Sequence, residues 1–181
     1  QIADFRGYSV WAKSPLAGVY VSRRQGDALE AEHALLPALP SAARVAEIMP
    51  WGGTTTTALL DRLEPDASLS VAELSENNLS FIKERLRRER QDLGRVSFDV
   101  MPGGKLPYEA ASLDLVVLPQ VLEHMPDPQA VLDEVRRVLV PGGAVVASAR
   151  NAASAYGALW REQEAKAQVP NQGPFTPIPA R

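Results

Sequence analysis

The sequence predicts an α/β fold in which a doubly wound, mainly parallel sheet carries helices on both faces. From Arg44 onward, short apolar runs of strand length alternate with segments whose apolar residues recur at helical spacing. This alternation is typical of βα units around a parallel sheet. The run over residues 113–118 is apolar at nearly every position, as expected for a strand buried on both faces. The chain of 181 residues is long enough for one such domain.

The first two predicted strands are each followed by a predicted helix. A strand over Arg44–Ile48 leads into a helix over residues 54–63, which Pro65 ends. A strand over residues 69–74 leads to Ser75, a residue suited to cap the next helix. The apolar stripe that this second helix should turn toward the sheet consists of Leu79, Ile82 and Leu86.

Three further strands are predicted over residues 95–100, 113–118 and 144–149. Asp127 offers a helix cap and Pro128 stands in the first turn, so a third helix begins there. We expect the turn at residues 141–143, with sequence Pro-Gly-Gly, to stop this helix sharply before the last strand. The apolar side of the helix comprises Val131, Leu132, Val135, Val138 and Leu139.

We divide the chain into three parts on this pattern. Residues 1–43 form an N-terminal helical or cap segment, in which residues 30–39 are expected to be a helix leading into the first strand. Residues 44–151 form the core. Residues 152–181 comprise a further helix over residues 156–168 and a tail that repeated prolines keep extended.

The composition is that of an ordinary soluble globular protein, with 45% hydrophobic and 23% charged residues. No apolar run reaches the roughly 20 residues that a membrane span needs. The segment after Gln1 lacks the apolar region of a signal peptide, so a cytoplasmic location is the default expectation. The absence of cysteine excludes disulfides and cysteine nucleophiles. The two histidines lack ligand spacing, and we predict no metal site.

The charge pattern does not indicate nucleic acid as a partner. The formal net charge is -3, which argues against an electrostatic footprint over the whole protein. Glu84 and Glu89 interleave with a basic cluster on one predicted helix, and this favours a solvated helix face over a binding surface. The basic residues are Lys83, Arg85, Arg87, Arg88 and Arg90.

The loops after the predicted strands are the candidate site, because open parallel sheets bind ligands beyond the carboxyl ends of their strands. After the first strand, Gly52 and Gly53 permit a close backbone approach to a ligand. The helix that follows would direct its first amides toward that ligand. Glu73 lies about 20 residues further on, the spacing at which an acid accepts hydrogen bonds from ribose hydroxyls. A polar segment over residues 119–128 follows the fourth strand.

These ordered segments resemble the class I S-adenosylmethionine-dependent methyltransferase superfamily over roughly residues 44–151. In that superfamily a first-strand acid and glycine loop, a second-strand acid, a Leu-Glu-His-like segment and a Pro-Gly-Gly turn recur. The segments at residues 106–108, 112–117, 121–124 and 141–143 look like its methyltransferase-11-type branch. The resemblance implies a Rossmann-like core, S-adenosylmethionine as cofactor and methyl transfer to an unidentified acceptor, either a small molecule or a protein.

A narrower resemblance is to small, poorly characterised bacterial methyltransferase-domain proteins with a degenerate glycine loop. It is suggested by the segments at residues 11–18, 50–52, 118–120 and 151–160. Members of that group usually continue past the point where this sequence ends. The last antiparallel strands of the fold are therefore expected to be absent here, and a partner could complete the site.

The resemblance implies roles for particular residues. Glu47 and Gly53 fall at the acid and the final glycine of the first motif, and Glu73 falls at the ribose-binding acid. Glu123 and His124 are candidates for removing a proton from the acceptor. Two of these residues also have a structural interpretation. The Glu73 carboxyl could accept its hydrogen bonds from a neighbouring helix, and His124 could be a packing residue. The cofactor-binding set is Glu47, Trp51, Gly52, Gly53, Glu73, Leu74 and Gln120.

Departures from the family pattern keep other functions open. Met49 and Trp51 stand where the common loop has glycines, and Pro50 removes a backbone donor between them. The Trp51 side chain could close the pocket or stack beside a ligand. Residues 101–102 replace the acid that many relatives use to bind adenine. A second hypothesis is therefore a catalytically inactive binding or assembly module. A nicotinamide-dependent oxidoreductase is disfavoured because Gly-x-Gly-x-x-Gly is absent.

Overall fold

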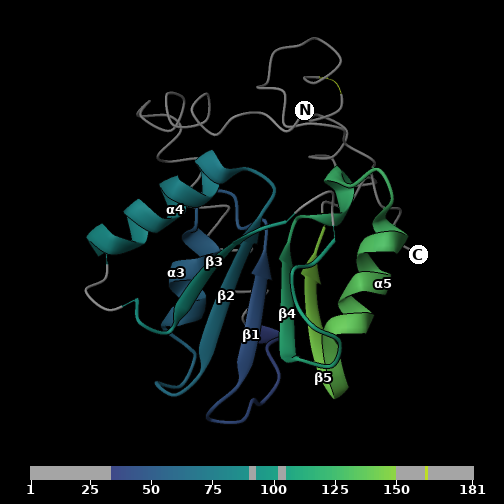
Figure 1. Ribbon diagram of the computed structural model, residues 1–181, viewed down its shortest axis with the longest axis horizontal. Coiled ribbons are helices and arrows are strands. Elements are labelled where there is room, and N and C mark those ends of the chain that lie inside the picture. Colours follow the sequence, from purple (N-terminus) through teal and green to yellow (C-terminus); the bar gives the residue numbers. More distant parts are fainter. Residues whose placement is uncertain (1–33, 90–92, 102–104, 150–161, 163–181) are drawn as a thin grey trace.

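The computed structural model describes residues 34–89, 93–101, 105–149 and 162. Its centre is a five-stranded sheet with strand order β3-β2-β1-β4-β5, in which every neighbouring pair is parallel (Figure 1). The chain progresses outward from β1 to β3 and then returns to place β4 on the other side of β1. The predicted doubly wound parallel sheet is therefore confirmed. The strands are β1 Arg44–Ile48, β2 Ser68–Glu73, β3 Val96–Val100, β4 Leu113–Pro119 and β5 Leu139–Ser148.

Helices cover both faces of the sheet, as predicted. The helices α3 (Thr54–Leu60) and α4 (Glu76–Glu89) pack on one face, and α5 (Pro128–Val138) packs on the other. Side chains alternate along each strand, so Val45 joins the core under α3 and α4 whereas Ile48 joins the core under α5. Two separate apolar layers result, and burial of both faces is what holds a parallel sheet together.

The predicted helix starts are confirmed by their hydrogen bonds. The Asp127 side chain accepts a hydrogen bond from the Ala130 amide at 3.1 Å, with Pro128 in the first turn of α5. The Ser75 hydroxyl oxygen accepts from the Asn78 amide at 3.4 Å at the start of α4. The stripe Leu79, Ile82 and Leu86 is buried, as its spacing predicted.

Asp114 has a structural role at the amino ends of β1 and β4. Its carboxylate accepts hydrogen bonds from the Arg44 backbone amide at 2.8 Å and from Arg44 Nε at 3.1 Å. The Arg44 hydrogen bond holds the pKa of the Asp114 carboxyl below its usual range. This pair lies at the end of the sheet opposite the loops that carry the candidate site.

Three predicted boundaries are wrong. The helix predicted over residues 54–63 ends at Leu60. The helix predicted over residues 30–39 has no helical backbone after Ala34 in the described part of that range, where Pro37 interrupts it. The Pro-Gly-Gly segment at residues 141–143 lies inside β5 rather than before it. Leu139 already has extended backbone and pairs with Leu113, and the register shift that follows accommodates the extra residues.

Several predictions concern residues that the structure does not describe. They include the aromatic-rich segment within residues 1–33, the tail after Ala149 apart from Glu162, and the presence or absence of antiparallel strands there. The division of the chain at residues 43 and 151 stays a prediction for the same reason. Within the described residues, no helix combines the length and apolar character that crossing a membrane requires.

Candidate active site

The loops at the carboxyl ends of the strands are tied together by backbone hydrogen bonds. The Met49 amide donates to the Ala72 carbonyl at 2.8 Å, and the Met101 amide donates to the Glu73 carbonyl at 2.8 Å. On the other side of β1, the Gln120 amide donates to the Ser148 carbonyl at 3.1 Å. All five strand ends therefore meet along one rim of the sheet, where the sequence predicted the site.

The loop after β1 keeps the backbone conformation of glycine at positions that carry large side chains. The φ angles are 53° at Met49, 55° at Trp51 and 76° at Gly53. The Gly53 amide donates to the Pro50 carbonyl at 2.9 Å and closes a tight turn. A left-handed backbone costs a non-glycine residue about 1–2 kcal/mol. The departure from the family pattern thus lies in the side chains, because Met49 and Trp51 retain the left-handed conformation that glycine favours.

Trp51 bridges the loop after β1 to the loop after β4. Its indole Nε1 donates a hydrogen bond to the Pro119 carbonyl at 3.1 Å. Its ring lies edge-on to the His124 ring, with centroids 4.8 Å apart and an interplanar angle of 70°. Since β1 separates β4 from β2, these contacts put the indole on the β4 side of the rim. Glu73 ends β2, on the other side of β1.

The Glu73 carboxyl is buried at the rim and partly satisfied by its own loop. Its Oε2 accepts hydrogen bonds from the Leu74 amide at 2.9 Å and the Ser75 amide at 3.4 Å. Burial raises the pKa of Glu73 to about 7, although hydrogen bonds from Ser75, Leu74 and Asn78 lower it. The next predicted site residue, Leu74, is half-buried and packs against the core under α5.

Glu47 lies beneath the loop rather than on its surface. Its side chain has no exposed area, and it is on β1 between Val71 of β2 and Val117 of β4. Alternation along β1 turns Glu47 toward α3 and α4, the same side as Val45. Solvent cannot reach this carboxyl in the structure. The geometry therefore favours a supporting role for Glu47 under the loop rather than direct contact with a ligand.

The two residues predicted to be catalytic stand together after β4. Glu123 and His124 belong to the short 3-10 helix η1 (Leu122–His124), and both side chains are buried. Gln120, directly after β4, has a left-handed backbone with φ 53° and also donates its amide to the Ser148 hydroxyl at 3.0 Å. The predicted site residues other than Glu47 thus lie at the rim, but Glu73 and Glu123, like Glu47 beneath it, are closed off from solvent.

Sequence reasoning missed the contacts that hold the loop from the side. Arg85 was grouped with a solvated basic face, yet its guanidinium donates to the Gly52 carbonyl at 2.7 Å. Arg88 fits the predicted solvated helix face better, because its side chain is 78% exposed and pairs with Glu84. The signal for Arg85 was its position three residues after the buried Ile82, which places both on one side of the helix.

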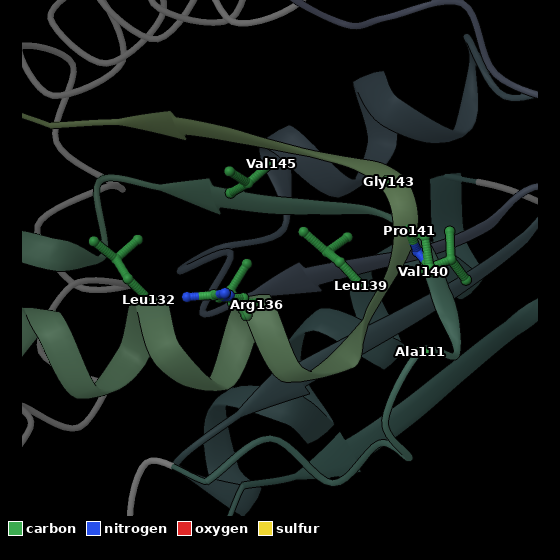
Figure 2. A pocket seen from close by; sticks show the side chains of 9 residues that line it. Ala111, Leu132, Arg136, Leu139, Val140, Pro141, Gly143 and Val145 are labelled. Carbon is green, nitrogen blue, oxygen red and sulfur yellow. The ribbon is translucent and has the colours of Figure 1, made fainter.

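A separate apolar groove of about 430 Å³ lies between α5 and the amino-terminal half of β5. Figure 2 shows Leu132 and Arg136 of α5 facing Leu139 and Val145 of β5. Ala111, which precedes β4, also lines the groove, so the groove extends to the end of the sheet opposite the rim. The groove and the predicted site are different places.

The family is decided by a match to a model described as a methyltransferase domain, over residues 51–147. This match covers more than half of the 181 residues. The chain belongs to the methyltransferase domain family. The predicted membership of the class I S-adenosylmethionine-dependent superfamily is therefore confirmed. Nothing in the comparisons supports the alternative of an inactive module.

Curated relatives match this methyltransferase domain over only part of their length. Methyltransferase GfsG of Streptomyces halstedii is 39% identical over 77 residues, which are 42% of this chain and 27% of that protein. The matched region spans 27% to 38% of the length of the first four curated relatives.

Solved structures share the fold. A Thermotoga maritima protein described as a SAM-dependent methyltransferase and possible histamine N-methyltransferase is 20% identical, with a TM-score of 0.64. The alignment covers 83% of this chain and 63% of that one. A complex of the Haloferax volcanii Trm112 methyltransferase activator with its putative methyltransferase gives a TM-score of 0.62 at 20% identity, covering 80% of this chain and 59% of that one. The Rossmann-like α/β fold is therefore confirmed.

Proposed function

We propose that the chain is a methyltransferase domain that binds S-adenosylmethionine at the rim and transfers its methyl group to an acceptor that is still to be identified. The observation that carries this proposal is the juxtaposition at the ends of β1 and β2. A loop that keeps left-handed backbone at Met49 and Trp51 begins beside the end of β2, the strand that Glu73 ends. Ligands of open α/β sheets bind at such a rim.

The residues present fit an adenosyl group. Glu73 would accept a hydrogen bond from a ribose hydroxyl, because a carboxylate has about four acceptor sites and Leu74, Ser75 and Asn78 use three of them. The Trp51 indole is held on the β4 side by its hydrogen bond to the Pro119 carbonyl and its contact with the His124 ring. No acid stands at Met101, so adenine would be held by apolar contacts with Leu74 and Met101 and by backbone groups.

S-adenosylmethionine bound at the rim would supply an electrophilic methyl group on its sulfonium sulfur. The rim would contribute mainly alignment of the two reactants. A neutral nitrogen or oxygen acceptor must also lose a proton, and we assign its removal to His124 or Glu123. Both side chains are buried, so the loop after β4 would have to move before either could reach the acceptor.

The partners and location in this proposal are those that the sequence predicts. The acceptor is a small molecule or a protein, and the protein acts in the cytoplasm. A protein partner is supported by the Haloferax volcanii neighbour, whose methyltransferase is bound to an activator. Nucleic acid is not indicated by the net charge of -3.

Calorimetric titration of the 181-residue chain with S-adenosylmethionine and with S-adenosylhomocysteine tests the proposal. We expect one-site binding of both ligands. Glu73→Ala should weaken binding roughly tenfold to a hundredfold, because hydrogen bonds to a charged group are worth about 1.5–3 kcal/mol. Glu64→Ala, at an exposed position away from the rim, is the matched control. A folded chain that binds neither ligand would contradict the proposal.

A further inference from the structure

Helix α4 contacts the glycine loop with two side chains one turn apart. Arg85 Nη1 donates to the Gly52 carbonyl at 2.7 Å and to the Thr54 hydroxyl oxygen at 2.9 Å. Ile82 packs against Gly53 so closely that a Cβ there would lie 3.0 Å from Ile82 Cγ2. The helix thus provides both a steric stop and a hydrogen-bond donor for the loop after β1.

The peptide group between Gly52 and Gly53 is held at both ends. Its carbonyl oxygen accepts from Arg85, and its amide donates to the Pro50 carbonyl at 2.9 Å. A peptide whose oxygen and amide are both bonded cannot rotate without losing both hydrogen bonds. Arg85 therefore opposes relaxation of the turn that contains the left-handed Trp51 and Gly53.

Arg85 is itself held in place by Glu89. Arg85 Nε donates to Glu89 Oε1 at 2.7 Å, and the Thr57 hydroxyl donates to Glu89 Oε2 at 3.0 Å. The pair is 30% and 39% exposed, whereas the Arg88–Glu84 pair of the same helix is 78% and 54% exposed. An ion pair with less exposure and several fixed partners orders its side chains better than an isolated surface pair.

We propose that Arg85 is a positioning residue for the donor site. It fixes the glycine loop relative to α4, and α4 begins at Glu76, three residues after Glu73. One helix thereby keeps the loop and the acid in a constant relation, and the strain at Met49 and Trp51 persists because neighbouring contacts over-determine the loop. The inference rests on the proposed binding of S-adenosylmethionine at the rim.

The test is the affinity of the 181-residue chain for S-adenosylmethionine, measured by calorimetry. Arg85→Met keeps the aliphatic stem and removes every donor, and we expect the Kd to rise about tenfold. Arg85→Lys, which retains one cationic donor group, should recover part of that loss. Arg88→Met is the matched control, since it removes an exposed arginine of the same helix that pairs with Glu84 rather than with the loop, and its Kd should stay unchanged.

A second readout follows the loop without any ligand. In a Trp11→Phe/Trp160→Phe background the only tryptophan is Trp51, so its fluorescence and near-UV circular dichroism report the loop. Arg85→Met should change both signals, and Arg88→Met should change neither. If Arg85→Met does not fold, the Trp51 signals of Arg85→Lys and Arg88→Lys are compared instead, and a change in Arg85→Lys alone supports the role of Arg85.

The outcomes separate this inference from the proposed function. A wild-type chain that binds S-adenosylmethionine, with unchanged Kd and unchanged Trp51 signals in the Arg85 variants, overturns the role of Arg85. A wild-type chain that does not bind S-adenosylmethionine overturns the proposed function. The Trp51 signals then still decide whether Arg85 holds the loop.

Discussion

At the scale of a single residue, the burial of Glu73 conflicts with the ionised state that ribose binding favours. A carboxyl group at the end of a buried strand loses hydration, and this raises its pKa to about 7. A carboxyl group that accepts ribose hydroxyls acts best when it is ionised. The amides of Leu74 and Ser75 partly reconcile the two, because they stabilise the charge on Oε2.

We expect Glu73→Gln to make the stability of the protein less dependent on pH. The raised pKa means that the folded state binds the proton more tightly than the unfolded state, so wild-type stability falls as the pH rises from about 4.5 to about 7. The shift corresponds to about 3 kcal/mol. The glutamine side chain cannot ionise, so the variant should gain stability relative to the wild type over this window. Urea unfolding of both proteins at pH 5, 6, 7 and 8 measures the difference.

The control for this titration is Glu64→Gln, which changes an exposed carboxyl elsewhere. Parallel stability profiles for Glu73→Gln and the wild type would show that Glu73 titrates normally. Binding should respond in the opposite direction, because the ionised carboxylate is the better acceptor. Wild-type affinity for S-adenosylmethionine should therefore rise with pH through 7.

The positions of the site residues could be predicted from the sequence, but their environments could not. Motif order was enough to place Glu73 and His124 at one rim. The burial of Glu73 depends on the strands that pair with β2. The hydrogen bonds from Trp51 to the Pro119 carbonyl and from Arg85 to the Gly52 carbonyl join residues more than 30 positions apart. No local pattern encodes such contacts.

At the scale of an element, α3 depends on packing against the rest of the fold for its stability. It has seven residues and no side-chain hydrogen bond at its cap, Gly53. Isolated helices of this length are unstable in water, so packing must hold it. Leu59 and Leu60 are buried under the sheet, and the Thr57 hydroxyl reaches α4 through Glu89. The start of α3 is therefore sensitive to how closely α4 approaches.

Gly53→Ala should destabilise the fold more than Gly142→Ala does. Both glycines have left-handed backbone, with φ 76° and 82°, so both substitutions incur backbone strain of about 1–2 kcal/mol. Only at Gly53 would the new Cβ meet another side chain, Ile82 Cγ2 at 3.0 Å, whereas nothing lies within 4 Å at Gly142. Overpacking adds about 1–3 kcal/mol. Urea unfolding of the two variants checks the difference.

The Ile82→Ala background isolates the steric part of this effect. Ile82→Ala removes the contacting methyl group, so adding Gly53→Ala there should cost little more than Gly142→Ala does in the wild type. Equal losses for the two glycine variants in the wild-type background would show that Ile82 gives way. The double-mutant comparison measures the coupling directly.

Periodicity predicted the elements well and their ends less well. The core strands and the buried stripe of α4 follow from side-chain alternation and helical spacing, which are local properties. The start of the last strand was predicted too late because the Pro-Gly-Gly segment has the composition that usually ends a helix. Its actual place inside β5 is set by pairing with β4, where Leu139 already lies opposite Leu113. Tertiary pairing decided that boundary.

At the scale of the whole molecule, the sheet has two ends with different properties. The rim end gathers the polar site residues and the strained loop after β1. The opposite end carries the Arg44–Asp114 pair and, between α5 and β5, the apolar groove of about 430 Å³. The strand order explains the difference, because ligands bind at the carboxyl end where progress along the sheet reverses between β1 and β4.

Hydrogen exchange with and without S-adenosylmethionine should show which end binds it. A ligand present at 100 times its Kd stabilises the folded state by about 2.7 kcal/mol and suppresses global unfolding everywhere. Local opening is suppressed only where the ligand binds. We therefore expect the largest slowing over residues 49–53, 73–75 and 119–125, and a smaller, uniform slowing over residues 132–145. At the same ligand concentration the Glu73→Ala variant should show a smaller local effect, since it lacks the acid that would bind the ribose. The largest slowing over residues 132–145 instead would assign the ligand to the groove and would remove Glu73 and the loop after β1 from the binding site.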